Sequence, residues 1–230
     1  MSPETYPLTV NARLDQPGRW LWLVKWLLLI PHYIVLALLW LAFLIVTVIA
    51  FFAILFTARY PKALFDFNAG VLRWSWRVSY YGYSGLGTDR YPPFTLADVP
   101  DYPARINIEY PQQLNRWLPL IKWLLAFPQY LIVGALLGSG YAVNTQHTDQ
   151  ANVSYAGPGL VGAIILIVAV ALLFTARYPA GLYDLVVGVN RWAYRLLVYV
   201  ALMTDRYPPF RLDQGGDDPA AVAAADEPGA

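Results

Sequence analysis

Long apolar stretches alternate with short, proline-containing polar segments along this 230-residue chain. Residues 20–56 contain only Lys25 and His32 as potentially charged groups, a pattern that predicts membrane-spanning helix. As one helix this stretch would be roughly 55 Å long, nearly twice the thickness of the hydrocarbon core. We therefore predict a transmembrane hairpin. The alternative is an in-plane helix over 20–30, a bend at Pro31 and one span over 32–56.

The pattern then repeats. "RWLWLVKWLLLIPHYIV" (19–35) aligns with "RWLPLIKWLLAFPQYLIV" (116–133), "FTARYP" occurs at 56–61 and 174–179, and "TDRYPPF" occurs at 88–94 and 204–210. This ordered series indicates a tandem duplication, with a first membrane repeat over 1–97 and a second over 98–212. The tail, 213–230, is acidic and rich in Gly, Ala and Pro, which predicts disorder.

A polar insert at 141–159 divides the apolar block of the second repeat into 117–140 and 160–176. Each piece is long enough to cross a hydrocarbon core of about 30 Å, the second only just. No Lys or Arg lies between Lys122 and Arg177, so the positive-inside rule places the insert outside and both flanks in the cytoplasm. Two hairpins give about four spans, with both termini cytoplasmic, in a bacterial inner membrane.

The segments after each hairpin, 62–87 and 180–203, predict amphipathic helices. Asp66, Arg73 and Arg77 fall within about 40° of one another at 100° per residue, and the second repeat has the same spacing. We predict that both helices lie in the membrane interface, with this stripe toward headgroups and the aromatic side chains toward lipid. A third span whose stripe faces a partner protein is the alternative.

"YPLTVNARL" (6–14) and "YPARINIEY" (102–110) alternate apolar and polar residues, which predicts one short surface strand per repeat. The two strands could pair and tie the repeats together. The predicted fold is thus an all-α integral membrane protein with two tandem repeats, each made of a strand, a transmembrane hairpin and an interfacial helix.

The composition supports a membrane location. Hydrophobic residues make up 58% of the chain and charged residues 13%, against about 25% charged in soluble domains. The net charge of +1 offers no basic field for nucleic acid, and the absence of cysteine excludes disulfides and thiolate metal sites. A metal site needs three or four ligands from His, Cys or carboxylates. His32 has no counterpart in the second repeat, and His147 has only Asp149 near it in the sequence, so we predict structural or solvated roles for both. We expect no cofactor and no enzymatic activity.

Arginine and tyrosine recur beside the prolines that end each apolar stretch. One reading is that these positions only stop helices and anchor them at the headgroup boundary. The other is that they bind lipid phosphates or acidic groups of a partner. The candidate lipid- or partner-binding residues are Arg59, Tyr60, Asp66, Arg73, Arg77, Arg90, Tyr91, Arg177, Tyr178, Asp184, Arg191, Arg195, Arg206 and Tyr207.

"KWLLLIPHYIVL", "FTARYPKALFDFNAGVLRWSWRV" and "TDRYPPF" resemble the membrane-protein family called domain of unknown function 4389, which is abundant in actinobacteria. The resemblance covers both repeats. The second repeat departs from it at Gln129, which replaces His32, and at the insert. The resemblance implies a membrane protein but no activity, substrate or cofactor.

Three functions follow from this pattern. The first is a non-catalytic accessory or scaffold subunit of a larger bacterial membrane complex, with other integral membrane proteins as partners. The second is a lipid-binding or transport-associated protein that uses the Arg/Tyr clusters at the cytoplasmic face. The third, least favoured, is an enzyme acting on lipid.

The topology can be tested in this cysteine-free chain with Gln146→Cys. Because the insert is predicted outside, a membrane-impermeant maleimide should label this cysteine in intact cells. Labelling only from the cytoplasmic side would contradict the predicted orientation.

Overall fold

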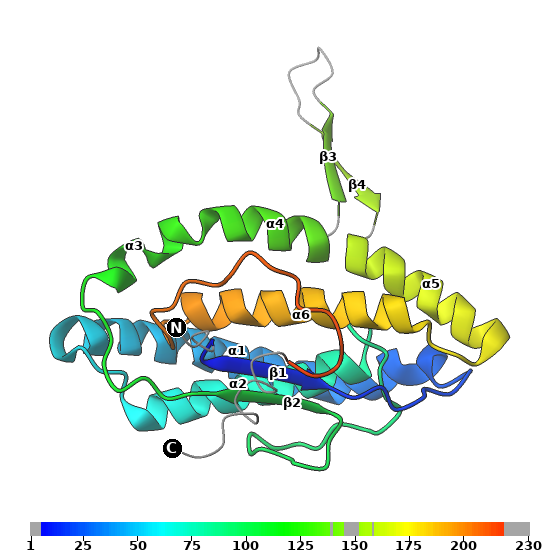
Figure 1. The fold of residues 1–230 in the computed structure, drawn as a ribbon, viewed down its shortest axis with the longest axis horizontal. Coiled ribbons are helices and arrows are strands. Elements are labelled where there is room, and N and C mark those ends of the chain that lie inside the picture. Colours follow the sequence, from blue (N-terminus) through cyan, green and yellow to red (C-terminus); the bar gives the residue numbers. More distant parts are fainter. Residues whose placement is uncertain (1–5, 139, 145–151, 158, 219–230) are drawn as a thin grey trace, which may run out of the picture.

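The computed structural model describes residues 6–138, 140–144, 152–157 and 159–218. The helices are α1 (Trp22–Thr57), α2 (Lys62–Tyr81), α3 (Leu118–Leu125), α4 (Phe127–Leu137), α5 (Leu160–Thr175) and α6 (Ala180–Val200). The strands are β1 (Leu8–Ala12), β2 (Ala104–Ile108), β3 (Gly140–Asn144) and β4 (Asn152–Gly157). The described chain is mostly helical, as predicted (Figure 1).

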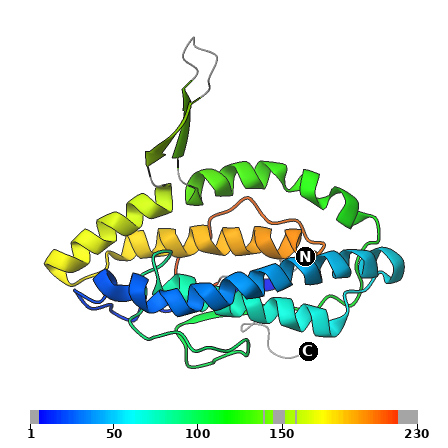
Figure 2. The same cartoon turned by 180° about the vertical axis from the view of Figure 1, so that it is seen from behind.

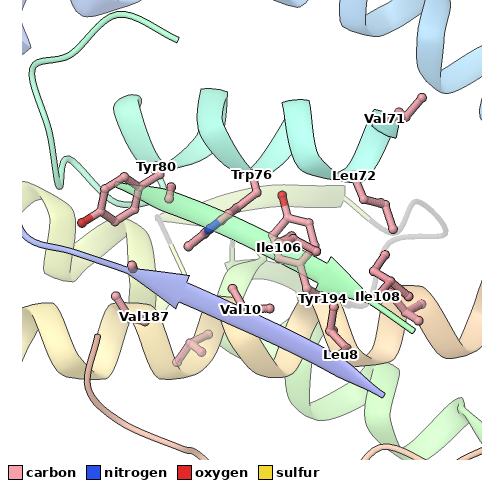
Figure 3. Close-up of a cluster of buried hydrophobic side chains, with 14 of the residues drawn as sticks. Leu8, Val10, Val71, Leu72, Trp76, Tyr80, Ile106, Ile108, Val187 and Tyr194 are labelled. Atoms are coloured by element: carbon pink, nitrogen blue, oxygen red, sulfur yellow. The ribbon is translucent and has the colours of Figure 1, made fainter. Parts of the chain in front are cut away.

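The two predicted strands exist and pair with each other, which confirms that they tie the repeats together. β1 and β2 are antiparallel, with Val10 opposite Ile106. The strands are exchanged between repeats, because β2 packs on α2 of the first repeat and β1 packs on α6 of the second. Apolar side chains of both strands and both helices, including Trp76 and Tyr194, meet in one core (Figure 3).

The hairpin predicted for the first repeat is wrong, and the alternative division into separate helices at Pro31 is not found. α1 is one continuous helix of 36 residues with Pro31 inside it. Residues 32–56 contain no Gly or Pro and no cluster of polar turn formers. A turn there would leave backbone polar groups unpaired in apolar surroundings, so the helix continues until Ala58, whose left-handed backbone (φ 57°) ends it.

The apolar block of the second repeat does divide near the predicted positions, but its pieces do not form a side-by-side hairpin. α3 and α4 meet at an angle of 45°, and α5 follows the insert. Figures 1 and 2 show α3, α4 and α5 as successive segments of one arch over α6, with β3 and β4 projecting from the point where α4 ends. The arch is therefore the counterpart of α1, interrupted by an inserted β-hairpin. Residues 145–151, including Gln146, lie outside the described residues.

α2 and α6 are core helices, which contradicts the prediction that their aromatic side chains face lipid. Trp76, Tyr80 and Tyr199 are at most 1% exposed. The reason is that each helix is covered on one side by an apolar helix of its own repeat and on the other by the exchanged strand. The aromatic residues therefore pack against protein.

Among the described residues, α1 alone is by itself long and apolar enough to cross a membrane, and the bent pair of α3 and α4 meets the same criteria when counted as one span. The part of the chain that the structure describes therefore offers at most two candidate spans, and the four predicted spans are not shown. We refer below to α1 as the first arm and to α3, α4 and α5 together as the second arm.

The first residues of the predicted disordered tail are structured. Asp218 is fully buried, and its carboxylate accepts a hydrogen bond from the backbone N–H of Val10 (3.0 Å) and pairs with Arg191 (3.2 Å) and Arg195 (3.1 Å). Residues 213–218 thus pack on the core, where their aspartates pair with two buried arginines. The composition of the tail does not predict this contact. Residues 219–230 lie outside the described residues.

Asp218→Asn should lower the free energy of unfolding by about 3–5 kcal/mol, because it removes the buried negative charge that faces two arginines. Asp217→Asn, an exposed neighbour, serves as the matched control and should change stability by less than about 0.5 kcal/mol. Unfolding monitored by tryptophan fluorescence in detergent measures both. Equal stability of the two variants would contradict this role of the tail.

Candidate functional site

Lys25 on α1 lies fully inside the protein. Its ammonium donates a hydrogen bond to the backbone carbonyl of Thr88 (2.6 Å) and lies 2.9 Å from the carboxylate of Asp89. It also sits over the ring of Tyr81, 4.6 Å from the ring centroid. Thr88 and Asp89 open the first "TDRYPPF" segment, which therefore returns to the start of the arm and neutralises a buried cation.

The second repeat builds the same site. Lys122 on α3 is 1% exposed, donates to the carbonyl of Thr204 (2.7 Å) and pairs with Asp205 (2.7 Å). Its ammonium lies 5.0 Å from the ring centroid of Tyr199. We call each such site a lysine clasp and each "TDRYPPF" segment, 88–94 or 204–210, a strap.

A tyrosine further along each strap holds the same arm. The hydroxyl of Tyr91 donates to the carbonyl of Leu28, and that of Tyr207 donates to the carbonyl of Leu125, both at 3.1 Å. Each strap is therefore bonded to its arm at two positions three residues apart, the lysine and the carbonyl that accepts from the tyrosine. The strap is therefore a structural tie, beyond the helix-stopping role predicted from its prolines.

The two repeats differ where His32 is replaced by Gln129. His32 accepts a hydrogen bond from the indole of Trp74 (3.1 Å) and stacks on Phe94, with ring centroids 4.0 Å apart. Gln129 accepts from Trp192 (2.6 Å) and also donates to the carbonyl of Pro208 (2.8 Å). Both residues thus connect an arm to a core helix.

The arginines of the predicted stripes bind protein groups. Arg73 donates to the carbonyl of Ile106 on β2 (3.3 Å), and Arg191 donates to the carbonyl of Val10 on β1 (2.9 and 3.0 Å). Val10 and Ile106 are opposite each other in the sheet, so the two hydrogen bonds occupy equivalent positions in the two repeats. Each guanidinium thereby links its helix to the strand of the other repeat.

The next arginine of each stripe is also used internally. Arg77 donates to the carbonyls of Thr95 and Ala97, and Arg195 pairs with the carboxylates of Asp213 and Asp218. Since both side chains are at most 2% exposed, neither guanidinium faces lipid headgroups. The aspartate of the first stripe has a different partner: Asp66 is exposed and pairs with Lys62 at 2.6 Å.

The structure divides the fourteen candidate binding residues into two groups. Tyr60, Arg77, Tyr178, Arg191 and Arg195 are buried, and Arg73 and Asp184 are half-buried. The exposed members are Arg59, Asp66, Arg90, Tyr91, Arg177, Arg206 and Tyr207. The structure does not gather the fourteen into one site. The sequence analysis did not identify Lys25 and Lys122 as candidate site residues. Their matching positions in two otherwise apolar blocks could have pointed to them.

Tyrosines join the two repeats. The hydroxyls of Tyr80 and Tyr183 are 2.9 Å apart, and Tyr178 donates to the carbonyl of Gly85. Burial raises the pKa of Tyr183 to about 12, and burial together with the neighbouring Tyr183 raises the pKa of Tyr80 further. Both hydroxyls therefore stay neutral and act as hydrogen-bonding groups.

Two of the concave regions among the described residues differ in character. A polar cavity of about 810 Å³ lies beside β1 and is lined by both signs of charge: Arg13, Arg90, Arg105, Asp15, Asp101 and Asp217. An apolar groove of about 420 Å³ lies between the arms, where Val48, Phe51 and Phe52 of α1 face Trp123 of α3. Within the described ranges, no three His, Asp or Glu side chains are placed to hold a metal ion.

The family described as Domain of unknown function (DUF4389) matches the chain over residues 19–95 and 150–211. These two segments together cover more than half of the sequence, and the protein belongs to this family. No curated protein and no solved structure matches the chain.

The lysine clasps can be tested by removing the charge while keeping side-chain length. Lys25→Met and Lys122→Met should each destabilise the fold by about 3–5 kcal/mol, because an aspartate and a carbonyl lose their buried partner. Lys62→Met is the control, since Lys62 is exposed and its pair with Asp66 contributes at most about 1 kcal/mol. Chemical unfolding in detergent gives the three values. A loss as small as the control's would mean that the straps are held by other contacts.

Proposed function

We propose that this protein is a non-catalytic accessory or scaffold subunit of a larger bacterial membrane protein complex. The observation that carries the proposal is the outer surface of the arms. Large side chains such as Leu38, Leu41, Leu131 and Ile167 are more than half exposed there, although the same arms bury their lysines. Apolar patches of this extent mark surfaces that contact protein or lipid.

The groove between the arms favours a protein partner. It is apolar, and its wall includes Trp123, which is 65% exposed, and Phe52, which is 52% exposed. Aromatic side chains around a concave site are typical of the energetically dominant part of protein interfaces. A partner helix that inserts one large apolar side chain would fill this groove.

The alternative, a lipid-binding or transport-associated protein, is favoured by a different observation. Arg59 and Arg177 are exposed where the two arms end, each beside a buried tyrosine. A guanidinium at such a boundary suits a lipid phosphate. Both functions rest on membrane insertion of the arms.

Native mass spectrometry of the tagged protein, extracted gently from its own membranes, distinguishes the two. The scaffold function predicts a second membrane protein at fixed stoichiometry, lost on Trp123→Ala in the groove. Trp117→Ala is the matched control, because Trp117 is 71% exposed outside the groove. A protein that carries one class of lipid and no partner would support the alternative, and recovery from the soluble fraction would contradict both.

A further inference from the structure

We propose that both arms lie parallel to the membrane plane within one leaflet and that neither crosses the bilayer. This inference rests on the proposed membrane association and specifies its geometry. It replaces the topology predicted from sequence, in which the insert and its two flanks lie on opposite sides of the membrane. Outside the groove between them, it commits the apolar face of the arms to one occupant, the hydrocarbon and headgroups of a single leaflet.

The length of the first arm is the first argument. A helix of 36 residues is about 54 Å long, and even at a tilt of about 40°, the upper end of the usual range, it would cover about 41 Å of depth. The hydrocarbon core is about 30 Å thick. Yet exposed side chains are apolar from Leu23 to Phe56, because Lys25 and His32 are buried. A spanning α1 would leave apolar turns among the headgroups.

The position of the polar surface is the second argument. Figures 1 and 2 show the β1–β2 pair lying lengthwise along the helices, so the polar side of the molecule runs beside the apolar side. This side carries Arg105 paired with Asp98, both more than 40% exposed, and the exposed Glu109. If the arms spanned, these charges would lie at membrane depth, where ionised side chains are strongly unfavourable. With the arms in the plane, they face water.

The third argument is the charge at the ends of the arms. Each arm begins after an exposed Arg-Trp pair, with Trp20 66% and Trp117 71% exposed. Each arm ends at an exposed phenylalanine followed by an exposed arginine, Arg59 or Arg177. Each of the four ends therefore carries an exposed arginine. Spanning arms would place two arginines on each side, against the positive-inside rule, whereas in-plane arms bring Arg19, Arg59, Arg116 and Arg177 to one layer of phosphates.

Cysteine labelling at the four ends tests the geometry. Gln16→Cys and Ala63→Cys flank the first arm, Gln112→Cys and Ala180→Cys flank the second, and all four positions are exposed. In vesicles of known orientation, the proposal predicts that a membrane-impermeant maleimide labels all four from the same side. Labelling of Gln16→Cys and Ala63→Cys from opposite sides would overturn it while leaving the proposed function intact. A chain that does not remain with the membrane would overturn both.

Depth along the first arm gives an independent measurement. Leu27, Ile34, Leu41 and Ile49 lie outside the groove on the exposed face and span about 33 Å of helix. Nitroxides attached to cysteines at these positions, compared by oxygen and nickel-chelate accessibility, should report nearly equal depths. A maximum at Ile34 and Leu41 with shallow ends would overturn the proposal. A label at the exposed Asn107 of β2 is the control and should lie outside the membrane.

Discussion

The need to neutralise one buried lysine in each apolar arm determines how each repeat folds. An ammonium removed from water requires a carboxylate and further acceptors close by. No acid is available on the arms themselves, so the strap must return to the arm to supply Asp89 or Asp205. That return requires the core helix to run back along the arm and to end near the lysine. The antiparallel pairing of α1 with α2 follows from this one contact.

A second constraint makes the two repeats depend on each other. A single short strand has an unpaired edge, and a single repeat would leave Arg73 or Arg191 without the strand carbonyl that it now binds. Exchange of β1 and β2 satisfies both needs across the repeat boundary. The division near residue 97 is therefore a boundary of the duplication and not of an independently folding domain, and residues as distant as Val10 and Asp218 share one core.

Local features of this fold could be predicted from sequence, and long-range ones could not. The repeat, the strand pair, the helix ends at "FTARYP" and the split of the second arm all follow from short patterns of residues. The continuity of α1 was missed because the second repeat splits through its insert, which the first lacks. The stripe of Arg73 and Arg77 has the same helical period whether it faces headgroups or backbone carbonyls, so periodicity alone could not place it.

The distribution of polarity in this molecule reverses that of a soluble helical protein. The helices that carry several charges, α2 and α6, are covered, whereas the arms, which have one lysine each, are exposed with apolar side chains outward. In water this arrangement would be unfavourable. The exposed apolar surface would contribute no hydrophobic stabilisation, and the buried guanidinium groups would lose their hydration. Next to hydrocarbon the outer surface is matched to its solvent, and every buried cation of the core helices already has protein acceptors. The proposed placement, with lipid on the side of the arms and water on the side of the sheet, would satisfy both surfaces of this fold.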